Sequence, residues 1–247
     1  MMEKTEKKFP DNVRSISGCI NGIFLYDLIW PYLVIIAMQI VLGNSYSTYV
    51  ENNYYTMSII LMIFTSIVTL AISLLIASPK LLISEYKMFK DAKDIKFILK
   101  CLGVMILANF VYNLLILALG VNPSGGNANQ NIVLEMIDNA PVLSFISMVI
   151  FAPILEEITY RYFLYGGIAK YNRKWAIILS GFVFMCVHAT ASFSKENVDI
   201  VRELILLPPY MFSGVVLAYA YDKTDNLATS TCIHSLNNLI SFILSVI

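Results

Sequence analysis

Several windows of about 20 mostly apolar residues can be drawn along this chain of 247 residues. An α-helix of that length crosses roughly 30 Å of hydrocarbon. The windows lie at about 23–43, 56–77, 97–119, 141–168, 174–193, 200–221 and 226–247. The first is too long to be a removable signal peptide and lacks a small-residue cleavage site, so we expect a retained helix. The pattern predicts an all-α fold, a polytopic membrane helical bundle with about seven transmembrane helices.

The composition also indicates a membrane protein and excludes other classes. Hydrophobic residues make up 58% of the chain and charged residues 14%, and the mean hydropathy is +0.71. An ordinary soluble domain is far less apolar. The formal net charge is zero, so the chain lacks the basic stripe with which proteins bind nucleic acid. We therefore expect membrane lipid around the chain and no nucleic-acid partner.

Lysine and arginine are concentrated in alternate connections between the windows. Because cytoplasmic loops carry an excess of these residues, the bias predicts which helix ends lie inside. The stretches 43–56 and 120–140 contain none and are expected outside. The groups expected inside are Lys4, Lys7, Lys8 and Arg14, then Lys80, Lys87, Lys90, Lys93 and Lys96, and finally Lys170, Arg173 and Lys174. The prediction is a multi-pass protein of the cell membrane with a cytoplasmic N-terminus.

The same patterns divide the chain into successive parts. We expect a cytoplasmic N-terminal segment at 1–22, N-terminal transmembrane helices at 23–120, an external loop at 121–140 and further transmembrane helices at 141–247. Within the loop, NPSGGNANQN at 122–131 disfavours helix and strand alike. The segment 79–96 sets lysines beside apolar residues at helical spacing, which fits either a basic amphipathic helix on the inner leaflet or a solvated connector.

Three short polar patterns interrupt the apolar windows of the second half. They are Glu156-Glu157-x-x-x-Arg161, Phe184-x-x-x-His188 and His234-x-x-x-Asn238, and they contain both histidines of the chain. Carboxylate, imidazole and amide groups at hydrocarbon depth cost several kcal/mol each unless they are paired. A membrane protein that keeps such groups is therefore expected to use them.

Helical spacing indicates how these side chains are arranged. Glu157 and Arg161 lie four residues apart, close enough for an ion pair that makes both tolerable in a membrane. Glu156 points about 100° away around the helix and is expected to face a cavity. Pro153 leaves a gap in the backbone hydrogen bonding of that helix. Phe184 lies one turn before the second motif's histidine, where its ring can wall the imidazole from water.

The third motif places His234 and Asn238 on one face of a helix, with Asn237 beside it. A free carboxylate, two imidazoles and an amide can together activate a water against a carbonyl carbon. The carboxylate accepts the proton, one histidine orients the water, and the other histidine and the amide donate to the developing oxyanion. The set predicts amide hydrolysis without a serine or cysteine nucleophile.

The ordered motifs EExxxR, FxxxH and HxxxN resemble those of the CPBP intramembrane proteases. This group comprises the type II CAAX prenyl endopeptidases and proteins of bacteriocin processing or self-immunity. The resemblance covers about 141–247, which it implies to be the catalytic transmembrane core. It implies that Glu156 and His188 activate the water, that His234 and Asn238 stabilise the oxyanion, and that Glu157 and Arg161 support the site. The implied activity is an intramembrane endopeptidase acting on a hydrophobic or lipid-anchored peptide, in bacterial peptide processing or bacteriocin self-immunity.

Other readings of these residues remain open. Glu156, His188 and His234 offer the three ligands of a zinc site, although HExxH is absent and a metal-free mechanism without a cofactor is favoured. A non-catalytic immunity or scaffold protein would keep the same motifs, and intramembrane carboxylates and histidines also mark transporters. Asn109 and Asn113 are expected to form interhelical hydrogen bonds rather than to take part in chemistry. Pro208 and Pro209 should break the sixth helix, where nearby aromatic residues are expected to pack or face lipid.

Overall fold

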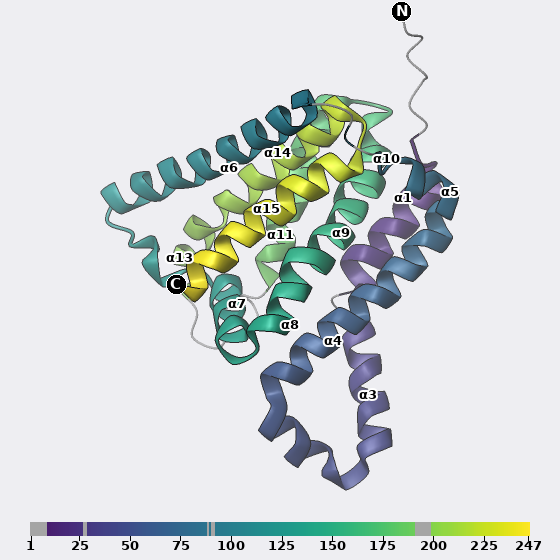
Figure 1. Ribbon diagram of the computed structural model, residues 1–247, viewed down its shortest axis with the longest axis vertical. Coiled ribbons are helices and arrows are strands. Elements are labelled where there is room, and N and C mark those ends of the chain that lie inside the picture. The colour runs from purple at the N-terminus through teal and green to yellow at the C-terminus, as the bar shows by residue number, and fades with distance from the viewer. Residues whose placement is uncertain (1–8, 27–28, 88, 90–91, 191–198) are drawn as a thin grey trace, which may run out of the picture.

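The computed structural model describes residues 9–26, 29–87, 89, 92–190 and 199–247. Within these residues every regular element is a helix, and six helices are long and apolar enough to cross a membrane (Figure 1). The six are Trp30–Glu51, Asn53–Ala77, Lys93–Ala118, Pro141–Ala169, Ile200–Thr224 and Leu227–Val246. The prediction of an all-α membrane bundle is confirmed, and its count of about seven helices is approximate.

The elements follow one another without interruption by any long irregular segment in the described part of the chain. In order they are α1 (Asn12–Cys19), η1 (Ile20–Leu25), α3 (Trp30–Leu42), η2 (Gly43–Ser45), α4 (Tyr46–Ala77), α5 (Pro79–Ser84), α6 (Ala92–Ala118), η3 (Pro123–Gly125), α7 (Ala128–Asn139), α8 (Pro141–Phe145), η4 (Ile146–Phe151), α9 (Ala152–Glu157), η5 (Ile158–Tyr165), α10 (Gly166–Ala169), α11 (Arg173–His188), α13 (Ile200–Leu206), α14 (Pro208–Thr224) and α15 (Leu227–Val246). Elements η1, η4 and η5 are π-helical, whereas η2 and η3 are 3-10 turns.

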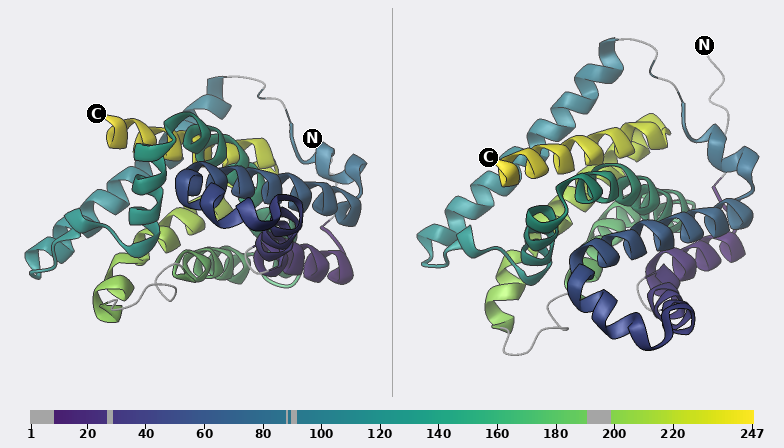
Figure 2. Two further views of the ribbon diagram at one scale, coloured as in Figure 1. Left: turned by 90° about the horizontal axis from the view of Figure 1, so that it is seen from below. Right: turned by 60° about the horizontal axis from the view of Figure 1, so that its bottom comes forward.

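One composite helix, α8–η4–α9–η5–α10, forms the centre of the bundle. It packs against α4 on one side and α15 on the other (Figures 1 and 2). Helix α11 packs along η5 and α14, so the segments that carry the three motifs are neighbours in space. The break expected at Pro208 is present, because α13 ends at Leu206 and α14 begins with this proline.

The described part of the N-terminal segment 1–22, expected to be cytoplasmic, contains helix. Helix α1 begins at Asn12, and its continuation η1 enters the bundle, where Asn21 is buried. The Asn21 amide donates hydrogen bonds to the Thr69 carbonyl at 2.9 Å and to the Ser73 hydroxyl at 3.0 Å. Hydropathy alone misplaced the start of this helix because a buried polar residue lowers the local average although its partners satisfy it.

Two glycines allow α1 and η1 to lie directly on the helix that carries the first motif. A Cβ atom on Gly18 would lie 2.2 Å from the Phe163 ring, and one on Gly22 would lie 2.1 Å from the Thr159 hydroxyl. The two glycines are four residues apart and therefore share a helix face. Small residues at this spacing let the backbones of membrane helices approach closely. The N-terminal helix thus packs directly against η5.

Replacing these glycines should destabilise the protein. Gly18→Ala and Gly22→Ala place a methyl group where Phe163 and Thr159 lie, and overpacking of this kind costs about 1–3 kcal/mol per site. Gly103→Ala on α6 is the matched control, because nothing lies within 4 Å of its added Cβ. The midpoint of thermal unfolding in detergent micelles should fall for the first two variants and stay constant or rise for the control. Equal midpoints for all three variants would contradict the close packing.

The stretches expected as external loops are largely helical. The chain is helical from Tyr46 onward in 43–56, with a kink at Asn53, and α7 occupies most of 121–140. The Asn127 side chain caps α7 by accepting a hydrogen bond from the Gln130 backbone at 2.8 Å. Asparagine disfavours the interior of a helix, but at the N-cap position it favours the start of one. The prediction of a plain loop is wrong here.

The segment 79–96 is neither one amphipathic helix nor a solvated connector in its described part. Helix α5 ends at Ser84, and Glu85 and Lys87 then bind the turn between α14 and α15. The Glu85 carbonyl accepts from the Leu227 backbone at 2.8 Å, and the Lys87 amine donates to the Asp225 carbonyl at 2.8 Å. Burial raises the pKa of Tyr86 to about 12. This segment therefore anchors the start of α15, the helix of the third motif.

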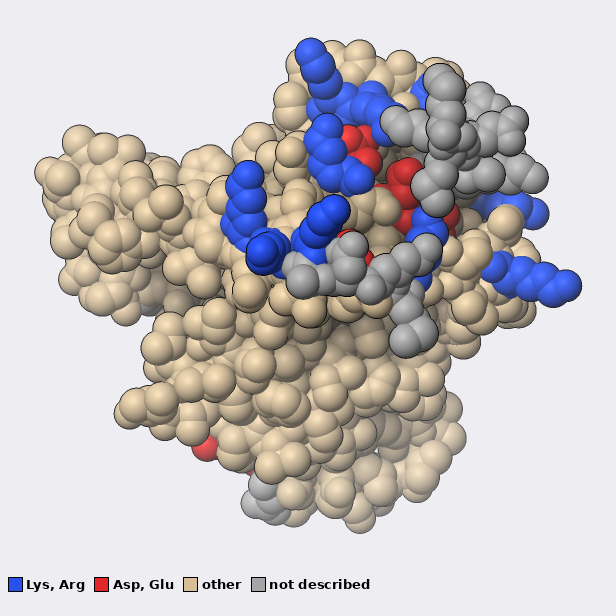
Figure 3. Space-filling view, turned by 45° about the horizontal axis from the view of Figure 1, so that its top comes forward, with Lys and Arg blue, Asp and Glu red and all other residues tan. Residues whose placement is uncertain are grey.

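Lysine and arginine side chains gather at one end of the bundle (Figure 3). The exposed ones come from helix ends that meet there, among them Lys80, Lys96, Lys170, Arg173, Lys174 and Lys223. The fifth predicted window, 174–193, corresponds to α11, which also starts at this end; residues 191–193 of this window lie outside the described ranges.

Candidate active site

The three motifs meet at a cavity of about 520 Å³. Helices α9, α11 and α15 contribute its chemically active lining, namely Glu156, Phe184, His188, His234, Asn237 and Asn238. Most of the remaining lining comes from α6, α7 and α14, and Met62 of α4 also contributes. The structure therefore brings the candidate residues of all three motifs to a single space, although they are up to 82 positions apart (Glu156 to Asn238) in the sequence.

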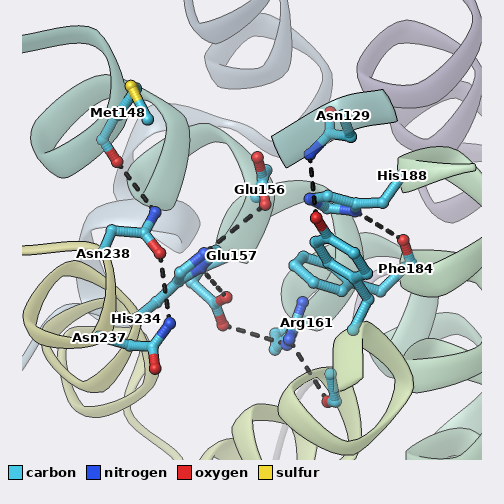
Figure 4. Close-up of polar contacts among 12 residues, drawn as sticks. Asn129, Met148, Glu156, Glu157, Arg161, Phe184, His188, His234, Asn237 and Asn238 are labelled. Atoms are coloured by element: carbon cyan, nitrogen blue, oxygen red, sulfur yellow. Dashed lines mark hydrogen bonds and ion pairs between the residues drawn. The ribbon is translucent and has the colours of Figure 1, made fainter. Parts of the chain in front are cut away.

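Glu157 and Arg161 form an ion pair that is completely buried. Arg161 Nε lies 3.1 Å from Glu157 Oε2, and both side chains have no exposed surface. Arg161 Nη2 donates to the Gly214 carbonyl at 3.3 Å, and its guanidinium lies 5.1 Å from the centre of the Phe184 ring. This arginine therefore links the first-motif helix to α11 and α14 (Figure 4).

The same carboxylate also orients His234. Glu157 Oε1 lies 3.0 Å from His234 Nδ1. Because a carboxylate only accepts hydrogen bonds, Nδ1 carries a proton, and Nε2 is left as the atom for chemistry. Nε2 lies 3.7 Å from Glu156 Oε2. Glu157 thus binds Nδ1 of His234, while Glu156 approaches Nε2 of the same ring (Figure 4).

Glu156 is the less confined of the two adjacent carboxylates. Its side chain is 25% exposed and lines the cavity, whereas that of Glu157 is fully enclosed. Its buried Oε2 has no hydrogen-bond partner among the described residues. A buried carboxylate oxygen without a protein partner is stabilised by a water or a substrate donor. The cavity beside Glu156 is the space from which such a donor can come.

His188 is held by its backbone and by two aromatic rings. Its Nδ1 lies 2.8 Å from the Phe184 carbonyl, which can only accept, so Nδ1 carries the proton and Nε2 is free to accept. Its ring lies 4.4 Å from that of Phe184 and is stacked on Tyr210 at 4.5 Å. Phe184 walls the imidazole as expected. Among the described residues no hydrogen bond joins His188 to Glu156 or His234, with which it shares the cavity.

Tyr210 connects His188 to the N-terminus of α7. Its hydroxyl accepts a hydrogen bond from the Asn129 amide at 3.2 Å and donates to the Asn127 side-chain oxygen at 3.3 Å. The α7 N-terminus is itself fixed by Glu203, whose carboxylate accepts from the Ala128 backbone at 3.0 Å. No sequence signal distinguished Tyr210 from the packing aromatic residues around it.

Asn238 is oriented by the Met148 backbone carbonyl, which has no hydrogen-bond donor within the central helix. Its Nδ2 donates to the Met148 carbonyl at 2.9 Å. The Ala152 backbone, the α-helical partner of this carbonyl, donates to Ser147 instead because η4 is π-helical. The π-helical partner would be Pro153, which has no N–H. The Met148 carbonyl is therefore free to accept the hydrogen bond from Asn238. Pro153, on the helix of the first motif, thus helps to orient a residue of the third motif.

Pro153→Ala should weaken this orientation. The restored N–H allows regular α-helical bonding through η4, which would occupy the Met148 carbonyl and release the Asn238 amide. Loss of one neutral hydrogen bond predicts an activity about threefold to tenfold lower. Pro141→Ala, at the exposed start of α8, is the control. Peptide hydrolysis and thermal unfolding should be measured together; an unaltered rate for Pro153→Ala at unaltered stability would contradict this role.

The zinc alternative can be compared with the arrangement of possible ligands. In the described ranges no group of three His, Cys, Asp or Glu side chains is placed to hold a metal ion. Glu156 and His234 approach each other, and Nδ1 of both histidines is engaged by a protein acceptor, which leaves Nε2 of each ring as the nitrogen that could bind a metal. The metal-free mechanism stays a prediction and is taken up below.

Comparisons with known proteins agree with the motifs. Residues 138–240 match the family model described as type II CAAX prenyl endopeptidase, Rce1-like. The UPF0177 protein YaiF of Lactococcus lactis subsp. lactis (strain IL1403) is 33% identical over 99 residues, which is 40% of this chain and 39% of that relative. No solved structure matches the chain.

The matched residues contain the whole first, second and third motifs, from Glu156 to Asn238. The family resemblance predicted from these motifs is thereby confirmed, and the apolar helices make the chain a multi-pass membrane protein. Residues 138–240 therefore resemble the Rce1-like domain of the type II CAAX prenyl endopeptidases, a family of membrane proteases.

Proposed function

We propose that this protein is an intramembrane endopeptidase that hydrolyses a peptide bond in a hydrophobic or lipid-anchored peptide by means of an activated water. The observation that carries the proposal is the unpartnered Glu156 carboxylate oxygen at a cavity that also contains both histidines. A carboxylate with access to water beside two imidazoles is suited to act as a general base. Each residue then has a role that follows from its hydrogen bonds.

In the first step, the water oxygen attacks the carbonyl carbon of the peptide bond and transfers a proton to Glu156. His188 orients the water, because its Nε2 can accept a hydrogen bond while Nδ1 is fixed on the Phe184 carbonyl. The carbonyl oxygen becomes an oxyanion. Asn238 donates its second N–H to it, since only one is used by Met148. His234 donates to the same oxyanion from Nε2 when this nitrogen carries a proton as well as Nδ1.

In the second step, the tetrahedral intermediate breaks at its carbon–nitrogen bond. The proton held by Glu156 passes to the leaving nitrogen, which departs as an amine, and the other product is a carboxylic acid. Glu156 therefore acts first as base and then as acid. Glu157 and Arg161 do not contact the substrate in this scheme; they hold His234 and the central helix in place.

The surroundings of the cavity support an apolar substrate. The helices around it are exposed along apolar faces, as expected of helices in contact with lipid. The gathering of lysine and arginine at one end supports a cytoplasmic location for that end and for the N-terminus (Figure 3). A peptide that is anchored in the same membrane can reach such a site without leaving the bilayer.

The test uses the purified full-length protein in lipid nanodiscs with two probes, an S-farnesylated peptide ending in Cys-Val-Leu-Ser and an apolar peptide without lipid. Mass spectrometry should detect two product peptides from at least one probe with the wild-type protein. Binding of either probe without any cleavage would favour a non-catalytic scaffold protein. A bacteriocin-processing or self-immunity role would then be tested with the native peptides of the producing cell.

Chelators should leave hydrolysis unchanged. The proposed mechanism uses Glu156 and His188 to bind and activate water and His234 to stabilise the oxyanion, without a metal ion, so dialysis against EDTA and o-phenanthroline should not lower the initial rate. Metal analysis of the dialysed protein confirms that removal was complete. A rate that falls on dialysis and returns with added Zn²⁺ would replace the metal-free mechanism with a zinc mechanism.

A further inference from the structure

Two asparagines of α6 line the active-site cavity although the sequence predicts that they bond to other helices. Asn109 and Asn113 both face the space that contains Glu156, His188 and His234. Neither is hydrogen-bonded to another helix in the described part of the chain, and Asn109 Oδ1 is buried without any partner there. The prediction of interhelical bonds is therefore wrong for both, and their amides are available to a ligand.

The positions of the two amides match the repeat of an extended peptide. Residues four apart on an α-helix lie about 6 Å apart along the axis and about 40° apart around it. An extended chain rises about 3.3 Å per residue, so the N–H and C=O groups on one edge recur about every 6.6 Å. The two Asn side chains can therefore pair with the backbone of alternate residues of one strand.

We propose that Asn109 and Asn113 form a subsite that holds the backbone of an extended peptide substrate along α6, one amide at a residue and the other two residues further on. The inference rests on the proposed function and adds to it the conformation in which the substrate is recognised. A carboxamide carries one donor group and one acceptor, as a peptide group does, so each pairing can satisfy both partners. Such binding is independent of the substrate's side chains.

The location of the pair fits this role. Helix α6 packs against α14 and α15, which carry Tyr210 and His234, so a strand held on its inner face lies beside the reacting groups. Asn113 is exposed and Asn109 is half-buried, so the pair leads from the open part of the cavity inward. The opposite face of α6, with Val111 55% exposed and Leu115 54% exposed, is directed to the surroundings.

The apolar part of the lining gives the substrate's side chains a place. Side chains of an extended strand stand perpendicular to its hydrogen-bonding edges. Once α6 holds one edge, they are directed at the adjoining walls, which include Met62, Met105, Leu134, Ile137, Leu217 and Phe242. The subsite therefore combines backbone pairing on α6 with apolar contacts elsewhere, and it takes an extended apolar peptide.

The test measures binding separately from hydrolysis. Full-length Glu156→Gln protein in nanodiscs is titrated with a fluorescein-labelled, S-farnesylated peptide ending in Cys-Val-Leu-Ser, followed by fluorescence anisotropy. A series of the same peptide carries one backbone ester at a time, which replaces a single N–H with oxygen. Esters at two positions separated by one residue should weaken binding about threefold to tenfold each, as expected for one lost hydrogen bond.

Asn109→Leu and Asn113→Leu, made in the Glu156→Gln background, identify the partner of each ester position. Each variant should weaken binding of the unmodified peptide to a similar extent and abolish the effect of one ester position only. Asn139→Leu, at the exposed end of α7 and outside the cavity lining, should bind all peptides like the parent protein. In otherwise wild-type protein, the two α6 variants should raise KM and leave kcat unchanged.

Several results would overturn the subsite. These are ester effects that persist in both α6 variants, the absence of any alternate-position pattern, and the absence of measurable binding. If the expected pattern is found while wild-type protein cleaves none of the peptides, the proposed hydrolysis is rejected and the subsite stands. If wild-type protein cleaves the peptide with no dependence on the α6 asparagines, hydrolysis stands and the subsite is rejected.

Discussion

Glu156→Gln should lower peptide hydrolysis by about a thousandfold or more while the protein stays folded. The substitution keeps the size of the side chain and removes the group that accepts the proton from water, and general-base catalysis contributes about 10²–10⁴-fold. The expected loss of rate is larger than for the base alone because Glu156 Oε2 also lies 3.7 Å from His234 Nε2. Initial rates should be measured on purified protein in nanodiscs with the peptide that the wild-type protein cleaves.

The adjacent carboxylates provide a matched comparison. Glu156→Gln should unfold at nearly the same temperature as the wild type, since its side chain is 25% exposed and forms no buried ion pair with arginine. Glu157→Gln should lose both activity and stability, because Glu157 is fully buried between Arg161 and His234. Full activity in Glu156→Gln would exclude this residue as the base and move the scaffold hypothesis ahead. Equal loss of stability in both variants would contradict the separation of their roles.

Arg161→Leu is expected to be among the most destabilising single substitutions in the chain. It leaves the Glu157 carboxylate buried, with no exposed surface and without its cation. Breaking a buried ion pair by removing one partner costs about 3–5 kcal/mol. It also removes the hydrogen bond to the Gly214 carbonyl, which links the central helix to α14. The midpoint of thermal unfolding in detergent micelles should fall sharply, and less folded protein should accumulate in the membrane.

The double variant Glu157→Leu/Arg161→Leu separates stability from function. Replacing a buried ion pair by apolar residues of similar volume is often neutral or stabilising, so much of the lost stability should return. Activity should not return, because His234 no longer has the carboxylate that fixes its Nδ1 proton. A double variant that recovers hydrolysis would show that Glu157 serves only as the counterion of Arg161.

The sequence was sufficient for the parts of this protein that depend on local spacing. Apolar windows predicted the helical bundle because a membrane-crossing helix must be about 20 residues long and apolar. The Glu157–Arg161 pair and the contact of Phe184 with His188 follow from positions four apart on a helix. The order of the three motifs was likewise enough to identify the family that the match at 138–240 confirms.

The helix boundaries were less predictable where polar residues are buried or capping. Asn21 is buried against α4, so the first helix begins earlier than hydropathy indicates. Asn127 begins α7 in a stretch that composition assigns to a loop. In both cases one amide side chain finds specific partners, and an average over a window does not register such partners.

Only the tertiary structure decided which groups meet across helices. Glu157 binds His234, the Met148 carbonyl binds Asn238, and Tyr210 stacks on His188. The two members of each pair lie on different helices, so no helical spacing predicts their contact. The two α6 asparagines, expected to join helices, face the cavity instead. Spacing within a helix determines which side chains share a face, whereas the packing of helices determines what that face meets. The chemical groups of the site were therefore evident in the sequence, but their hydrogen-bond partners depend on the fold.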